Sequence, residues 1–96
     1  MRHYEMMYIL RPDLDEEMLN EVIERFSSII EEYGGETVKL DRWGKRRLGY
    51  EINDLHEGYY VLVDFRGEVA LTDELSRRMR LSESVLRHMI VSQEEE

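Results

Sequence analysis

The chain has 96 residues, of which 42% are hydrophobic and 36% charged, with a single proline and no cysteine. This length suits one domain around a single core, and the lack of cysteine excludes disulfides, thiolate nucleophiles and Cys-based zinc sites. No apolar run approaches the ~18–20 residues needed to cross a bilayer, so we expect a cytoplasmic protein without membrane contact. A formal net charge of −9 would ordinarily argue against binding to a polyanion.

Charge is distributed unevenly along the sequence. Residues 13–36 hold nine carboxylates and a single arginine, whereas residues 39–47 hold five cations and only one carboxylate. A second cationic group comprises Arg77, Arg78, Arg80 and Arg87. We therefore predict a two-sided molecule, in which the overall negative charge hides a basic surface that can meet a polyanion.

The first third of the chain predicts a strand followed by a helix. Residues 4–10 are a short apolar run, typical of a buried central strand. Asp13 and Glu16 have the spacing of a capping box, and acidic residues crowd the first turn after them. Apolar residues then recur every three or four positions over 19–33, which predicts an amphipathic helix of about five turns. The glycine pair 34–35 supplies its C-cap.

The rest of the chain predicts three more strands and a second helix. Apolar positions alternate on both sides of Gly44, so we expect one long strand over residues 36–52 that bends near this glycine. The elements that follow are a turn at 53–58, a strand at 59–65, a helix at about 71–80 and a strand at 85–91.

This order of elements predicts an α+β fold of the ferredoxin-like βαββαβ type. Its four-stranded antiparallel sheet carries both helices on one face and has the first and third strands in the centre. We assign residues 1–92 to this single domain and residues 93–96 to a short acidic tail. Strand alternation directs one set of side chains towards the helices: Tyr4, Met6, Tyr8, Leu10, Tyr59, Val61, Val63 and Phe65.

The sheet face away from the helices would expose more apolar surface than a lone monomer usually does. Alternation brings five candidate protein-binding residues to this open face, beside Val91. They are Met7, Ile9, Tyr60, Leu62 and Met89. We therefore expect the open face to contact another protein.

The strongest functional signal is a basic stretch in the long strand. Lys45, Arg46 and Arg47 are adjacent there, between the aromatic residues Trp43 and Tyr50. Cations neutralise phosphates, and aromatic rings stack on bases or pack against sugars, so the stretch suits RNA. The alternative is a charged rim that pairs with the acidic helix.

Alternation also predicts where the side chains of this segment point. Leu48, Tyr50 and Ile52 are expected to anchor the second half of the strand to the core. Arg47 is then expected on the open face. Alternation directs Arg46 to the core side. Its guanidinium must therefore extend to the rim beyond the helices or pair with a carboxylate.

The second cationic group also has two interpretations. Arg87 is expected on the open face among apolar neighbours, where a guanidinium suits an interface or a phosphate. Alternatively it pairs with Glu5 on the neighbouring strand. Arg80, with the arginines at 77 and 78, either contacts RNA or complements the dipole at the end of the second helix.

The sequence contains no motif of a catalytic or metal site. Its three histidines, His3, His56 and His88, share no metal-ligand spacing, and His88 is in phase with core-facing Leu86 and Ile90. A glycine-rich phosphate loop and a nucleophile elbow are both missing. We expect a protein that is not an enzyme and that binds no metal, cofactor or small-molecule substrate.

Five short segments, in order and at their spacing, carry a family resemblance. They are MRHYE at 1–5, RPDL at 11–14, WGKRRLGYEI at 43–52, EGYY at 57–60 and VLRHMIV at 85–91. Together they resemble bacterial small-subunit ribosomal protein six, collinearly from residue 1 to about 91.

The resemblance implies the ferredoxin-like fold and a structural role in the small ribosomal subunit. The family binds the central domain of small-subunit rRNA as a heterodimer with ribosomal protein eighteen. Mapped onto this sequence, it implies RNA contacts by a set of cations with Trp43 and Tyr50 beside them. The cations are Arg2, Lys45, Arg46, Arg47, Arg80 and Arg87.

A second hypothesis is a ferredoxin-like regulatory or ligand-binding module that self-associates through the open sheet face. Ligand-binding modules of this shape tend to have glycine-rich junctions between strand and helix, which this chain lacks. For the ribosomal hypothesis, the negative net charge predicts weak RNA binding by the chain alone. A basic partner would offset the repulsion.

Overall fold

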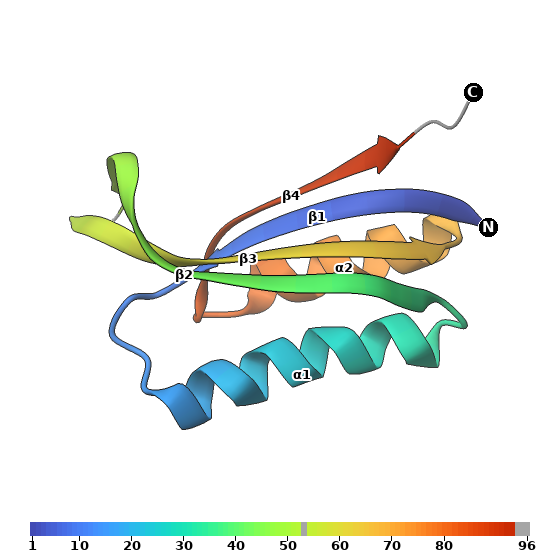
Figure 1. Cartoon of the computed structure of the whole chain (residues 1–96), viewed down its shortest axis with the longest axis horizontal. Coiled ribbons are helices and arrows are strands. Elements are labelled where there is room, and N and C mark those ends of the chain that lie inside the picture. Colours follow the sequence, from blue (N-terminus) through green and yellow to red (C-terminus); the bar gives the residue numbers. More distant parts are fainter. Residues whose placement is uncertain (53, 94–96) are drawn as a thin grey trace.

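The computed structural model describes residues 1–52 and 54–93, and the order of its elements is the predicted one. The elements are β1 (Arg2–Leu10), α1 (Glu16–Glu32), β2 (Glu36–Ile52), β3 (Leu55–Gly67), α2 (Val69–Leu81) and β4 (Val85–Gln93). The strands form one antiparallel sheet in the order β2-β3-β1-β4. Both helices cover the same face of this sheet (Figure 1), which confirms the ferredoxin-like fold.

The first helix begins later than the capping-box pattern predicts. Asp15 is the N-cap, and its Oδ1 accepts a hydrogen bond of 2.9 Å from the backbone N–H of Met18. The prediction that Asp13 caps the helix is therefore wrong, and its carboxylate instead lies 3.2 Å from Nε of Arg11. At the other end Gly34 has φ +74°, which confirms the left-handed C-cap.

The core lies between the two helices and the inner sheet face. All the predicted inward-facing residues of the two central strands are buried, except that Tyr59 is only partly buried against the core. The ring of Tyr8 meets Phe26 of α1 edge-on, with 5.3 Å between ring centroids, and Tyr4 stacks on Phe65 at 5.5 Å. These aromatic contacts fix the first helix and the central strands to one another.

Three irregularities interrupt the pairing of the long strand β2 with β3, and the last of them lies in the distal part of the strand, between Arg47 and Ile52. The register shifts between Thr37 and Lys39, and again between Arg42 and Gly44. Gly44 has φ +83° and lies at the predicted bend. Since a bulge inserts one extra residue, the side chains that follow it are exchanged between the two sheet faces until the next irregularity. Even-numbered residues therefore face the helices at Leu40 and Arg42 but the open side at Arg46.

Most elements extend beyond the predicted boundaries; β1, for example, begins at Arg2 instead of Tyr4, and β3 ends at Gly67 instead of Phe65. The strand β3 already begins at Leu55, so a turn over 53–58 is wrong, and Asn53 itself lies outside the described residues. The helix α2 starts at Val69 rather than Leu71. The strand β4 continues to Gln93, and the part of the expected acidic tail at 94–96 lies outside the described residues.

The paired ends of β2 and β3 form what we call the hairpin arm, residues 45–52 with 55–59. In Figure 1 the arm projects past the ends of the helices, and its β2 side turns away from them, towards the open face of the sheet. The sequence stretch with the strongest functional signal is therefore carried mostly by a projecting arm.

Candidate RNA-binding arm and protein-binding sheet face

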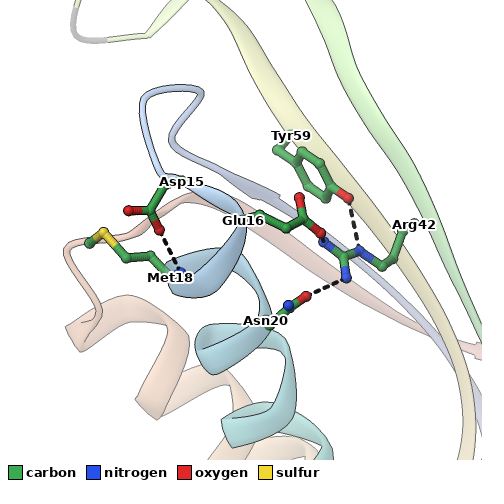
Figure 2. Close-up of polar contacts among 6 residues, drawn as sticks. All are labelled: Asp15, Glu16, Met18, Asn20, Arg42 and Tyr59. Atoms are coloured by element: carbon green, nitrogen blue, oxygen red, sulfur yellow. Dashed lines mark hydrogen bonds and ion pairs between the residues drawn. The ribbon is translucent and has the colours of Figure 1, made fainter.

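The first cation of the basic region is used to build the fold. Arg42 lies opposite buried Val61 on the helix-facing side of the sheet. Its guanidinium donates hydrogen bonds to Tyr59 Oη (2.8 Å) and to Asn20 Oδ1 (2.6 Å), and forms an ion pair of 2.9 Å with Glu16 (Figure 2). The hydrogen bond with Tyr59 is the main cause that raises the pKa of Arg42, and Glu16 adds to it. Arg42 thus connects β2 and β3 to the start of α1.

The alternative that Lys45, Arg46 and Arg47 form a rim paired with the acidic helix is wrong; the cation that pairs with α1 is Arg42. Lys45, Arg46 and Arg47 are exposed, and none of them forms an ion pair with another described residue. No sequence signal distinguished Arg42 from these three cations. Its partner Asn20 is one polar residue among many on α1, so the network was missed.

The bulge after Arg42 reverses the predicted directions of the two arm arginines. Arg46 pairs with Gly58, a position of β3 that belongs to the open face. The guanidinium carbon of Arg46 lies 5.5 Å from the ring centroid of Trp43. Arg47 pairs with Glu57 and therefore has the helix-side parity. The prediction that Arg47 points across the open face and Arg46 towards the core side is wrong, because it assumed unbroken alternation.

Tyr50 is not a core anchor. Its side chain is 59% exposed, and the guanidinium carbon of Arg87 on β4 lies 4.8 Å from its ring centroid. The alternative pairing of Arg87 with Glu5 is also wrong, since the partner of Arg87 across the sheet is Ile9. Leu48 and Ile52 are likewise outside the core cluster, so the arm is held by contacts on the open side instead.

The arginines of α2 divide into paired and unpaired ones. Glu74 accepts two hydrogen bonds from Arg77 (2.8 and 2.9 Å) and one from Arg78 (2.7 Å). The guanidinium of Arg77, followed by that of Arg78, lowers the pKa of the Glu74 carboxyl to about 2. Arg80 has no carboxylate partner among the described residues and lies exposed in the last turn of the helix.

The structure brings together most of the predicted RNA-binding residues, but not all. Arg87 lies beside the arm, whereas Arg80 lies in the last turn of α2, where its charge acts on His88 on the helix-facing side of the sheet. Arg2, in contrast, pairs with Gly67 at the opposite end of β1, and Arg87 is level with Ile9. Seven strand residues separate these two levels, which corresponds to about 23 Å. Arg2 therefore cannot share one small site with the arm.

The open face carries four of the five predicted partner-binding residues in accessible positions. Met89 is 52% exposed, and Met7, Tyr60 and Leu62 are partly exposed beside it. Ile9 has the expected parity but is only 5% exposed, so the prediction that this face displays it is wrong. The cause is Gly58: a Cβ there would lie 2.3 Å from Cγ2 of Ile9, which shows how closely Ile9 packs against the arm backbone.

The histidines and carboxylates of the described residues do not gather into a metal site. No cluster of three or more His, Asp or Glu side chains suited to a metal occurs in residues 1–52 and 54–93. His88 is partly buried on the helix-facing side opposite Tyr8, where burial, and next the charge of Arg80, lowers its pKa. Neither described helix has the length and apolar character of a membrane span.

Comparison with known proteins identifies the family of this fold and arm. A sequence model of the family described as ribosomal protein S6 matches residues 3–92. The chain belongs to the ribosomal protein S6 family. It is 50% identical over 95 residues to "Small ribosomal subunit protein bS6" of Desulforamulus reducens, covering 99% of this chain and all of that protein. The corresponding protein of Desulforudis audaxviator is 51% identical over 94 residues, covering 98% of this chain and all of the relative.

Solved structures agree with this membership. The crystal structure of 30S ribosomal protein S6 from Thermotoga maritima superposes with a TM-score of 0.90 at 33% identity, covering 96% of this chain and 87% of that one. The C-terminal domain of the MgtC protein from Mycobacterium tuberculosis has a TM-score of 0.68 at 9% identity, which shows a shared fold alone. The S6 family consists of structural proteins of the ribosome and not of enzymes.

Proposed function

We propose that this S6-family protein binds the central domain of small-subunit rRNA as a heterodimer with ribosomal protein eighteen of the small subunit. It would act in the cytoplasm as a structural component of the ribosome. The observation that carries the proposal is the gathering of Arg46, Arg47 and Arg87 on and beside the projecting arm, without a carboxylate partner in the described chain.

A projecting basic arm suits contact with folded RNA. Its arginines supply phosphate contacts that do not depend on sequence, and the neighbouring rings of Trp43 and Tyr50 are both about half exposed. Each ring already lies against a guanidinium, at 5.5 Å and 4.8 Å respectively, so arginine and ring present one combined surface. Lys45 and Arg80 extend the positive charge around it, and Arg2 would make a separate contact.

The need for a partner follows from the charge. With 22 acidic and 13 basic residues, the chain has a net charge of −9, which opposes its approach to RNA. A basic protein on the open sheet face would offset this repulsion and would cover the exposed side chains of Met89 and Val91. The two surfaces are adjacent, because the arm turns towards the open face (Figure 1).

The test is to measure binding of a central-domain rRNA fragment by this chain, by ribosomal protein eighteen and by their mixture. We expect weak binding by the chain alone and much tighter binding by the mixture. Tight binding by the chain alone would contradict the cooperative proposal. A chain that self-associates and ignores both RNA and protein eighteen would favour a regulatory module.

A further inference from the structure

The charged residues of the open sheet face are distributed unevenly along the strands. Glu5 on β1 lies directly opposite Asp64 on β3. Both side chains belong to the open face, because the residues before and after each of them in its strand are buried on the helix side. Arg87 lies level with Ile9, four residues further along β1, which is roughly 13 Å away. The Glu5–Asp64 end of the face also carries Glu36 and Asp41, so its four carboxylates outnumber its two cations, Lys39 and Arg66, whereas the other end carries Arg87.

The two carboxylates have no cationic partner in the described chain. Neither Glu5 nor Asp64 forms an ion pair with any residue of 1–52 or 54–93. Lys39 is opposite Asp64 on β2, but its ammonium lies 3.4 Å from Asp41 instead. Like charges directly opposite each other destabilise an antiparallel pair. The free chain therefore keeps an unfavourable arrangement on the one face that lacks a covering layer.

Apolar side chains flank this pair of carboxylates on two sides, whereas Lys39 lies opposite Asp64 and Arg66 lies two residues further along β3. Val91 is opposite Glu5 on the β4 side and is 42% exposed. The next level along the strands contains Leu62, Met7 and Met89. A guanidinium or ammonium placed over the carboxylates would have its charge satisfied, while its aliphatic stem would lie on the apolar floor.

We infer that the open face docks a basic protein segment that inserts an arginine or lysine between Glu5 and Asp64. The inference rests on the proposed function and specifies the chemistry of the partner. Charge complementarity favours a cationic protein over RNA, because phosphates would be repelled by the same carboxylates. An arginine fits best, since its planar fork can bind both carboxylates and its flat surface packs on apolar side chains. RNA is left to the basic end of the face and to the arm.

The experiment compares ribosomal protein eighteen binding to the wild-type chain and to the double variant Glu5→Gln/Asp64→Asn, which keeps the shape and removes both charges. We expect the variant to bind at least about tenfold more weakly, because a partner cation loses its carboxylates at a covered site. The control is Glu17→Gln/Glu24→Gln, which removes the same charge from the exposed acidic surface of α1 and should leave the affinity within about twofold.

Two further readouts distinguish a docking site from a structural role of these carboxylates and from an RNA-binding face. The free double variant should be as stable as the wild type or slightly more stable, since the like-charge contact is gone, whereas a structural role would make it less stable. Equal affinity of wild type and double variant for protein eighteen would overturn the inference and leave the proposed function standing. No binding of protein eighteen to the wild-type chain would overturn both. A double variant that gains RNA affinity without the partner, beyond the gain of the control variant, would assign the face to RNA and would also overturn the inference.

Discussion

The guanidinium carbon of Arg87 lies 4.8 Å from the ring centroid of Tyr50, and this contact joins the two strands at opposite edges of the sheet. Tyr50 is near the end of β2 and Arg87 near the start of β4, so the contact spans the open face. It has two consequences. The arm is held towards the sheet, and a cation of β4 is placed beside the cations of the arm.

Replacing Tyr50 with Leu should loosen the arm. A cation–π contact at an exposed site is worth about 0.5–1 kcal/mol, so we expect a loss of stability of that order and faster amide hydrogen exchange over residues 47–52. Tyr50→Phe keeps the ring and serves as the control. Unchanged exchange in the Leu variant would mean that the contact does not hold the arm.

Arg42 and Arg47 should have opposite roles, although only five positions separate them. Arg42→Met removes hydrogen bonds to Tyr59 and Asn20 and an ion pair with exposed Glu16, which we expect to cost about 1–2 kcal/mol of unfolding free energy. Affinity of the folded protein for RNA should be unchanged. Arg47→Met should leave urea stability within about 0.5 kcal/mol and weaken RNA binding. The reverse pattern in the two variants would contradict the assignment of Arg42 to the fold.

The Glu74 carboxyl should contribute to acid stability. Its pKa is about 2 in the folded chain, below the ordinary value of 4.5, because Arg77 and Arg78 donate to it. A folded pKa below the unfolded one stabilises the protein fully above about pH 4.5, and this contribution is lost as pH falls through about 2. The stability difference between wild type and Glu74→Gln should therefore be constant above pH 5 and shrink towards pH 2.

The effect should also shrink in high salt, because both arginines are about half exposed. Glu24→Gln is a suitable control, since Glu24 makes no ion pair within the described residues. A stability difference for Glu74→Gln that is the same at pH 6 and pH 2 would show that the arginines do not hold this carboxylate.

Gly58 and Gly49 offer a matched pair of glycines in the arm. A Cβ at Gly58 would lie 2.3 Å from Cγ2 of Ile9, whereas one at Gly49 would meet nothing within 4 Å. We expect Gly58→Ala to destabilise the chain by about 1–3 kcal/mol, because Ile9 is buried and must move. Gly49→Ala should change the unfolding free energy by no more than about 0.5 kcal/mol. Equal effects in thermal unfolding would contradict the packing of the arm on Ile9.

Periodicity and turn residues were sufficient to predict the element order, the central strands and the inward-facing core of this protein. They failed where a backbone irregularity changes which sheet face the following side chains occupy. The bulge between Arg42 and Gly44 has one sequence signal, a glycine inside the strand pattern, which was interpreted as a bend and not as an extra residue in β2. Arg46 and Arg47 were therefore assigned to the wrong sides. Tyr50, which lies in the further irregular stretch between Arg47 and Ile52, was wrongly assigned to the core.

Long-range contacts explain the remaining differences. Arg42 is indistinguishable in sequence from its basic neighbours, and only the position of α1 over β2 shows that Asn20 and Glu16 reach it (Figure 2). Ile9 alternates as an exposed residue does, yet the returning arm covers it. In both cases the deciding neighbour is distant along the chain, beyond what local periodicity can reveal.

The central claim is that the unpaired arginines of the arm contact RNA. It is tested most directly by measuring how the affinity of the complex with ribosomal protein eighteen for a central-domain rRNA fragment depends on salt. For Arg46→Ala/Arg47→Ala we predict weaker binding and a log–log slope flatter by about 0.7–0.9 per lost phosphate contact. Arg77→Ala/Arg78→Ala, which removes two cations already paired with Glu74, should keep the wild-type slope. An unchanged slope in the arm variant would contradict the claim.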